Sequence, residues 1–295
     1  MKTLARIIFI TTILGFAANS AAQDDNEELK IAAVEALITA PPDRALPLVN
    51  KVLQGDNSTE LKERALFILS QIDREEARET LLRFARESSG ELQEEAIRMI
   101  GIGGNRDSLA TLMSIYESGD SEAREAVIEA FMIAGDSKAL LEIALVAAGD
   151  DYDEAVDMLG AMGARDELRQ LREKNGVSEA LIDAYAISGD LAELRTMAMD
   201  ASDPDLQAQA IEAMGIVGGS EVNASLVQIF RDAKSDDIRE AALEGMMISG
   251  YDEGVLELYR STDDKKLKKK LLEQLVIMDS DEVWNIIDSA LDGGL

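Results

Sequence analysis

The amino-acid sequence predicts an all-α protein built as an α-solenoid of about nine stacked helix pairs. Three observations lead to this fold class: a helix-favouring composition, an internal repeat of about thirty residues, and glycine or aspartate at the expected joints. The chain combines 46% hydrophobic residues with only 4% aromatic residues and 4 prolines. It is rich in Ala, Leu, Glu, Ile and Met, which favour helices. A chain this apolar is expected to fold around a core.

The repeat is visible when one alanine in each apolar stretch is aligned with the next. These alanines follow one another at steps of 25 to 32 residues: Ala33, Ala65, Ala96, Ala126, Ala155, Ala180, Ala210 and Ala241. A ninth, divergent unit begins near Lys270 and is expected to form a C-terminal cap repeat. Self-similarity at such a period is typical of repeat proteins, in which each unit covers its apolar face with its neighbours.

One unit, which begins after Asp120, shows the expected layout of a helix pair. Asp120 is placed to cap a first helix by accepting backbone N–H bonds, and apolar residues then follow at steps of three and four. Gly135 is expected to end that helix in the left-handed conformation. Asp136 or Ser137 would cap the second helix, which we expect to continue to Gly149.

Three passages resemble the short HEAT-like repeats that also occur in phycobilisome-lyase proteins. Residues 43–49 are similar to the opening of that family's second helix, residues 236–243 to its inter-repeat turn and first helix, and residues 120–126 to a looser copy of the latter. The resemblance covers nearly all of the chain after residue 22. It implies a right-handed α/α superhelix, and a scaffold that binds another protein or peptide on its curved surface. An alternative stays open: an accessory subunit or a lyase-like modifying protein related to those proteins.

The first 22 residues are expected to be a secretory signal peptide. Lys2 and Arg6 precede an apolar stretch over 7–18, and small residues come before an expected cut after Ala22. The apolar stretch is short for a membrane-spanning helix, which needs about 20 residues, although a retained anchor is the alternative. We therefore expect residues 23–295 to form a single exported solenoid, located in a bacterial periplasm.

The absence of two residue types excludes several function classes. With no cysteine and no histidine, the chain lacks the usual ligands of zinc, iron–sulfur, c-type haem and blue-copper sites. Ser-His-Asp and Cys-His catalysis are excluded as well. The net charge of −29 opposes nucleic-acid binding. We therefore expect no cofactor, no metal, no nucleic acid and no enzymatic activity, and a protein or peptide as the partner.

Acidic turns and methionines are weaker candidates for metal sites. Asp150, Asp151 and Asp153 crowd one joint, and calcium prefers oxygen ligands, but helix capping accounts for acids at a joint. Met158 and Met162 are four residues apart, and thioethers can hold Cu(I). Both lie on an apolar helix face, where methionine fills the core. We expect neither group to bind a metal.

Aromatic and arginine residues recur near the ends of expected second helices. Tyr116, Phe230 and Tyr259 each follow an aliphatic residue at a similar place in their repeat, and Arg231 and Arg260 directly follow two of them. Aromatic residues and arginine are frequent hot spots of protein interfaces. We therefore predict that these five residues contact a partner. The alternative is that the rings pack between adjacent repeats.

A lysine run opens the last unit, against the acidic character of the chain. Five lysines lie within residues 265–270. Lys265, Lys266 and Lys269 are predicted to contact an acidic partner or an anionic surface, and the alternative is a solvated face beside nearby aspartates. Trp284 is expected to pack against the end of the array.

Overall fold

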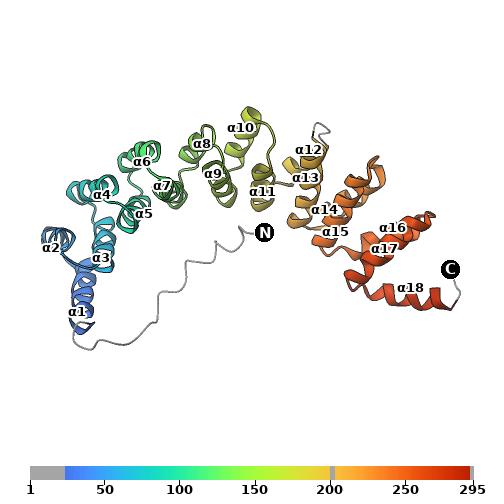
Figure 1. Cartoon of the computed structure of the whole chain (residues 1–295), viewed down its shortest axis with the longest axis horizontal. Coiled ribbons are helices and arrows are strands. Elements are labelled where there is room, and N and C mark those ends of the chain that lie inside the picture. Colours follow the sequence, from blue (N-terminus) through green and yellow to red (C-terminus); the bar gives the residue numbers. More distant parts are fainter. Residues whose placement is uncertain (1–23, 200–202, 293–295) are drawn as a thin grey trace. The chain divides into compact units, whose positions relative to one another are not determined.

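A computed structural model describes residues 24–199 and 203–292 of the chain (Figure 1). These residues form 18 α-helices and one short 3-10 helix, and they contain no strand. In chain order the 18 helices form nine pairs, each made of a first and a second helix. This confirms the predicted α-solenoid and its number of pairs. The predicted signal peptide, residues 1–22, lies outside the described residues.

The helices belong to two compact units, one ending at Gly103 and the other beginning at Gly104. The first unit contains α1 (Asp24–Glu35), the 3-10 helix η2 (Ala36–Thr39), α2 (Pro42–Gln54), α3 (Thr59–Ser70), α4 (Glu75–Glu87) and α5 (Glu91–Gly103). Its core is formed by aliphatic side chains from α2 to α5, such as Val49, Leu66 and Ile97, which are fully buried. Whether residues 23–295 act as one array stays a prediction.

The second unit contains the remaining thirteen helices in the described part of the chain. They are α6 (Arg106–Ser118), α7 (Ser121–Ala134), α8 (Ser137–Ala144), α9 (Asp150–Ala161), α10 (Arg165–Asn175), α11 (Glu179–Ser188), α12 (Leu191–Met199), α13 (Pro204–Val217), α14 (Ser220–Asp232), α15 (Asp236–Ile248), α16 (Asp252–Ser261), α17 (Lys265–Ile277) and α18 (Asp281–Leu291). The first helices α7, α9, α11, α13 and α15 contact one another in this order (Figure 1). The second helices α8, α10, α12, α14 and α16 pack against one side of this row of first helices (Figure 1).

Side-chain caps and glycines set the helix ends much as the sequence predicts. The Asp120 carboxylate accepts a bond from the backbone N–H of Ala123 at 3.0 Å. Gly135 ends α7 with a φ of +73°, where an L side chain would be strained. Asp136, and not Ser137, caps α8.

The end of the second helix in this unit differs from the prediction. α8 ends at Ala144 and not at Gly149, because the chain tightens into a turn in which Val146 and Ala147 both donate to the Ile143 carbonyl oxygen. Residues 145–148 are all apolar, so the sequence contains no capping residue that would have indicated this earlier helix end.

The first helices of the second unit pack with their backbones in close approach. A Cβ atom on Gly160 would lie 2.8 Å from the Cα of Ala184, and one on Gly215 would lie 2.4 Å from the carbonyl oxygen of Gly245. Glycine at these crossings lets α9 meet α11, and lets α13 meet α15, more closely than a larger residue would allow. The first helices therefore form a dense row.

The last helix pair is less covered than the others. Val283 of α18 is fully buried, whereas the neighbouring Trp284 is 53% exposed. The expectation that Trp284 packs the end of the array is therefore wrong, since Val283 takes the buried position. Among the described helices, none combines the length and the apolar character needed to cross a bilayer.

Candidate functional site

The three predicted aromatic residues lie between helices and not on the surface. Tyr116, Phe230 and Tyr259 are all buried, as the packing alternative expects. The Tyr116 hydroxyl donates to the Asp151 carboxylate at 3.0 Å, and the Arg124 guanidinium donates to the same oxygen at 2.7 Å. Burial and the bond to Asp151 raise the pKa of Tyr116 to about 12. A role of these rings in partner binding stays a prediction, but their faces are covered.

Five arginines of the second helices α10 to α16 form a regular set of ion pairs. Each pairs with an acidic residue about 21 to 26 positions later, on the next second helix. We call this set the second-helix ladder: Arg169 and Arg172 with Glu193, Arg195 with Glu221, Arg231 with Glu257, and Arg260 with Glu282. The ladder connects α10, α12, α14, α16 and α18.

The two ends of the second-helix ladder differ in burial. At its beginning, the Glu193 side chain is 12% exposed. Farther along, Glu221, Glu257 and Glu282 are 73%, 53% and 54% exposed. Buried ion pairs are costly to break, because removing one partner leaves a buried charge behind. Exposed pairs contribute about 0–1 kcal/mol. The beginning of the ladder is therefore structural, and its later pairs can be exchanged at low cost.

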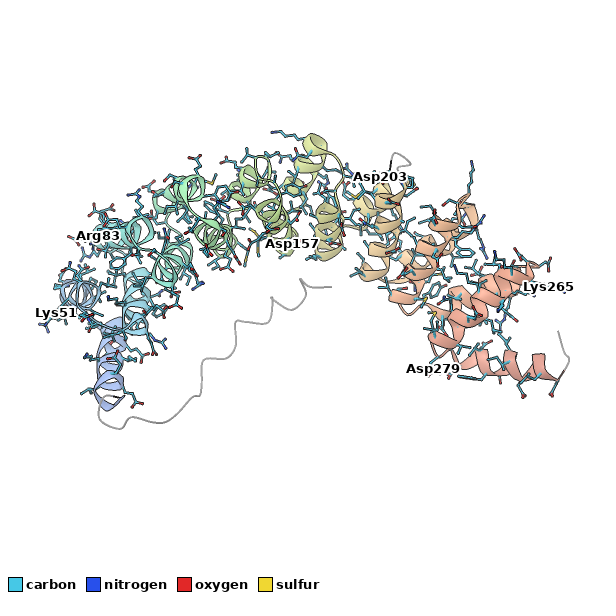
Figure 2. The ribbon with its side chains drawn as sticks, in the orientation of Figure 1. Lys51, Arg83, Asp157, Asp203, Lys265 and Asp279 are labelled. Atoms are coloured by element: carbon cyan, nitrogen blue, oxygen red, sulfur yellow. The ribbon has the colours of Figure 1, made fainter. Side chains whose placement is uncertain are left out.

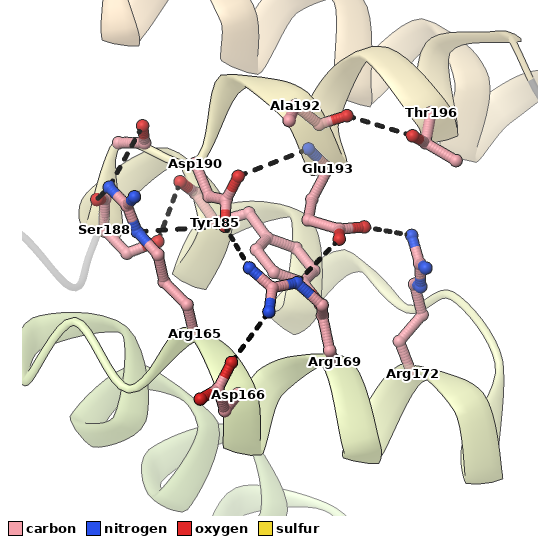
Figure 3. A network of polar contacts seen from close by, with 11 residues as sticks. Arg165, Asp166, Arg169, Arg172, Tyr185, Ser188, Asp190, Ala192, Glu193 and Thr196 are labelled. Carbon is pink, nitrogen blue, oxygen red and sulfur yellow. Dashed lines mark hydrogen bonds and ion pairs between the residues drawn. The ribbon is translucent and has the colours of Figure 1, made fainter.

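A buried polar network surrounds the first pair of the ladder (Figure 3). The Asp190 carboxylate lies 3.8 Å from Nε of Arg165 and 3.5 Å from Nη2 of Arg169, and it accepts a bond from the backbone N–H of Glu193. The Tyr185 hydroxyl is buried beside it without a hydrogen-bond partner among the described residues. Burial and the nearby Glu193 carboxylate raise the pKa of Tyr185 well above its usual value. Sequence reasoning missed this network, although its arginines are visible as a basic segment.

The later pairs of the ladder line a surface hollow of about 430 Å³. Its walls come from α14, α16 and α18, and its lining residues are Arg231, Glu253, Leu256, Glu257, Arg260, Ser261 and Glu282. Two residues that the sequence singled out, Arg231 and Arg260, are thus brought together. The guanidinium of Arg231 lies 2.6 Å from Glu257, and that of Arg260 pairs with Glu282. The hollow offers guanidinium and carboxylate groups beside the side chain of Leu256.

The predicted lysines lie outside this hollow. Lys265 and Lys266 occupy the exposed first turn of α17, where Figure 2 shows Lys265. The Asp264 carboxylate caps this helix and offsets the unfavourable position of cations at a helix N-terminus. Lys269 pairs with Glu273 on its own helix at 3.7 Å. The lysines form a solvated face, and their contact with a partner stays a prediction.

One group of carboxylates in the described residues could hold a metal ion by distance. The carboxylate oxygens of Glu125, Glu129 and Glu154 lie within 4.8 Å of one another. Exposed acidic groups often stand this close without an ion, so no metal site is assigned. At the joint that the sequence singled out, Asp151 is bound to Arg124 and Tyr116.

These features define a helical-repeat protein with HEAT-like helix pairs and a polar surface on its second helices. No protein-family model matches the sequence, and no curated protein matches it. Similar solved structures include the complex of CpcE and CpcF of phycocyanin lyase from Nostoc sp. PCC7120. The sequence identity is 20%, the alignment covers 97% of this chain and 100% of that chain, and the TM-score is 0.32. Human deoxyhypusine hydroxylase in complex with glycerol has 16% identity, 77% and 98% coverage, and a TM-score of 0.31. An engineered protein has 16% identity, 84% and 97% coverage, and a TM-score of 0.26. This likeness concerns the fold alone.

The expectation that the chain is not an enzyme is wrong. The similar structures include proteins named as a lyase and a hydroxylase. The absence of histidine and cysteine excludes only the chemistry that needs them. The likeness assigns no reaction to this chain.

Proposed function

We propose that the chain is an accessory protein that binds another protein on the second-helix surface of its second unit. The observation that supports this most is the hollow between α14, α16 and α18, in which Arg231 and Arg260 lie close together. Arginine is enriched among interface hot spots, because its planar guanidinium can bind carboxylates with two bonds. As an accessory subunit, the chain would hold a partner protein in place.

The energetics of the ion pairs favour this hollow over the rest of the ladder. The pairs of Arg231 and Arg260 with their glutamates are more than half exposed on the carboxylate side, so each contributes about 0–1 kcal/mol. A carboxylate from a partner can replace Glu257 or Glu282 at little cost, and it excludes water as it binds. The Glu193 pairs cannot be exchanged in this way, because the Glu193 side chain is only 12% exposed.

Substitution of the two arginines tests the proposal. The tagged chain is crosslinked in cells, and the captured protein is identified and then measured against Arg231→Ala/Arg260→Ala. We expect the double substitution to reduce capture about tenfold or more, in line with hot-spot losses of about 2 kcal/mol. Arg44→Ala, an exposed arginine of the first unit, is the matched control. Capture that is equal in both variants, with unchanged thermal unfolding, would contradict the proposal.

We also propose that the chain acts outside the cytoplasm, in a bacterial periplasm. The support is the N-terminal sequence, in which Lys2 and Arg6 precede an apolar stretch and small residues. Fractionation of cells and N-terminal sequencing of the purified protein test this. We expect a periplasmic protein that begins at Gln23, and a cytoplasmic protein that retains Met1 would contradict it.

A further inference from the structure

The first helices of the second unit carry a recurring pair of surface residues. Four of these helices end at a glycine with φ between +66° and +73°. In each of the four, an acidic residue lies six positions before that glycine and an isoleucine lies two positions before it. The pairs are Glu129 and Ile133 on α7, Asp183 and Ile187 on α11, Glu212 and Ile216 on α13, and Glu244 and Ile248 on α15. In α9 the same positions hold Asp157 and Ala161. We call these ten residues the first-helix strip.

The isoleucines of the first-helix strip are only partly covered by the protein. They are 41%, 53%, 63% and 49% exposed, in chain order: Ile133, Ile187, Ile216 and Ile248. A single exposed apolar residue is ordinary. Exposure of the same large residue at one repeat position, on four of five successive helices, places a periodic apolar row on the surface. Such a row is what an interaction surface requires.

The acidic residues lie on the same face as the isoleucines. Residues four positions apart on a helix are neighbours on its surface, so each acid accompanies the isoleucine of its own helix. Figure 2 shows Asp157 on the side of α9 that faces away from α8 and α10. Burial, and then the carboxylate of Asp183 on the next helix, raises the pKa of Asp157. Burial, and then the carboxylate of Glu244 on the next first helix, likewise raises the pKa of Glu212. Two pairs of acids on adjacent helices, Asp157 with Asp183 and Glu212 with Glu244, are therefore close enough to repel one another.

The charges of this strip differ from those of the second-helix ladder. In the ladder, each acid pairs with an arginine of the preceding second helix. In the strip, Asp157, Asp183, Glu212 and Glu244 form no ion pair with a cation of the described residues. These four acids therefore place unneutralised negative charge beside the apolar row, and a cationic partner would relieve their repulsion.

We propose that the first-helix strip is a docking surface for a basic amphipathic helix of another protein. Leucine-like side chains of that helix would cover the isoleucines, and its lysine or arginine side chains would pair with the acids. This surface is made of other helices than the hollow, so the proposal goes beyond the proposed function.

The spacing of the strip favours a helical partner. Packed helices lie about 8–10 Å apart, so the strip repeats at about that distance. Residues seven positions apart on a helix lie on one face and about 10.5 Å apart, which fits this repeat. An extended strand places residues of one face about 6.8 Å apart, which does not. A second copy bound strip to strip would place acids against acids, and an anionic membrane would be repelled.

A designed peptide tests the docking surface with the purified full chain. The probe is a labelled helical peptide of about 22 residues, with leucine and lysine on one face at a period of seven and alanine and glutamine elsewhere. A peptide of the same composition in scrambled order is its control. Binding is measured by fluorescence anisotropy. We expect the ordered peptide to bind, and the scrambled one to bind at least tenfold more weakly.

Substitutions in the strip give the second arm. Each isoleucine is about half exposed, so its loss is expected to weaken binding about fivefold, and Ile187→Ser/Ile216→Ser/Ile248→Ser about a hundredfold. Val146→Ser, at a residue that is 79% exposed beyond α8, is the matched control. Asp183→Asn/Glu212→Gln/Glu244→Gln leaves the apolar row intact and is expected to weaken binding and reduce its dependence on salt.

Three outcomes would overturn the proposal. The first is equal binding of the ordered and the scrambled peptide, which would show attraction by net charge alone. The second is unchanged binding by both strip variants, when circular dichroism shows that they are folded. The third is a dimer in sedimentation that dissociates on the isoleucine substitutions, because a second copy would then occupy the strip. Arg231→Ala/Arg260→Ala is expected to bind the peptide normally, so failure here and failure of the proposed function are distinguishable.

Discussion

The close approach of α13 and α15 predicts that Gly215→Ala destabilises the second unit. A Cβ at this position would lie 2.4 Å from the carbonyl oxygen and 2.8 Å from the Cα of Gly245. Both are backbone atoms, so the contact can be relieved only if the two helices separate. Overpacking a core costs about 1–3 kcal/mol, and this contact belongs at the upper end. Alanine in place of glycine in a helix returns about 1 kcal/mol. The net loss is about 2 kcal/mol, or a Tm lower by about 4–8 °C.

Thermal unfolding of the purified chain, followed by circular dichroism, measures this effect. Gly103→Ala is the matched control, because its added Cβ would meet only the Ser70 carbonyl oxygen, at 3.8 Å. That substitution is expected to leave the Tm unchanged or to raise it, through the gain in helix propensity. If Gly215→Ala is as stable as Gly103→Ala, the packing of α13 on α15 is not as described, and the reasoning from close helix crossings is refuted.

Three further predictions concern buried and charged groups. Tyr185→Phe removes a buried hydroxyl without a hydrogen-bond partner, so urea unfolding is expected to show unchanged stability or a gain of about 1 kcal/mol; a loss of that size would show that the hydroxyl is satisfied. Arg169→Ala leaves the buried Asp190 with one cation fewer and is expected to lower the Tm more than Arg231→Ala does, because the pair of Arg231 with Glu257 is exposed; equal losses would contradict the division of the ladder. Burial and then Glu179 raise the pKa of Asp183 in the folded chain, so ionised Asp183 disfavours folding. Asp183→Asn is therefore expected to stabilise the chain at neutral pH, with a benefit that disappears as the pH falls through the raised pKa; a benefit that persists in acid would contradict this cause.

The helix pairs could be predicted because their ends are encoded locally. Asp120 and Gly135 act within a few residues of their own position, as a cap and as a left-handed stop. The end of α8 could not be predicted, because the apolar residues after Ala144 continue a helical pattern while the chain turns. Whether another helix buries a given side chain also depends on tertiary packing, so the nearby sequence does not encode it. The sequence leaves open whether Tyr116 and Phe230 face a partner or pack between repeats, and the structure buries both.

The first-helix strip is present in the sequence, but its residues lie at different distances from the repeat alanine in different helices. Counted from the repeat alanine to the closing glycine, α9 runs from Ala155 to Gly163 and is one residue shorter than α7, which runs from Ala126 to Gly135. One residue rotates a helix position by about 100°, so an alignment on the alanine places surface positions on different faces. An alignment on the glycine brings the acids and isoleucines into register. The ladder pairs have no such signal, because they depend on how the second helices cross.

Contact with a partner from two defined surfaces tests the account most directly. A photo-crosslinking amino acid is placed at Ile216 in the first-helix strip, at Ser261 in the hollow, or at Val146 as an exposed control, and cells are irradiated. We predict protein adducts from residues 216 and 261 and none from residue 146. Adducts of equal yield from all three positions, or none from the first two, would contradict the claim that these surfaces bind protein partners.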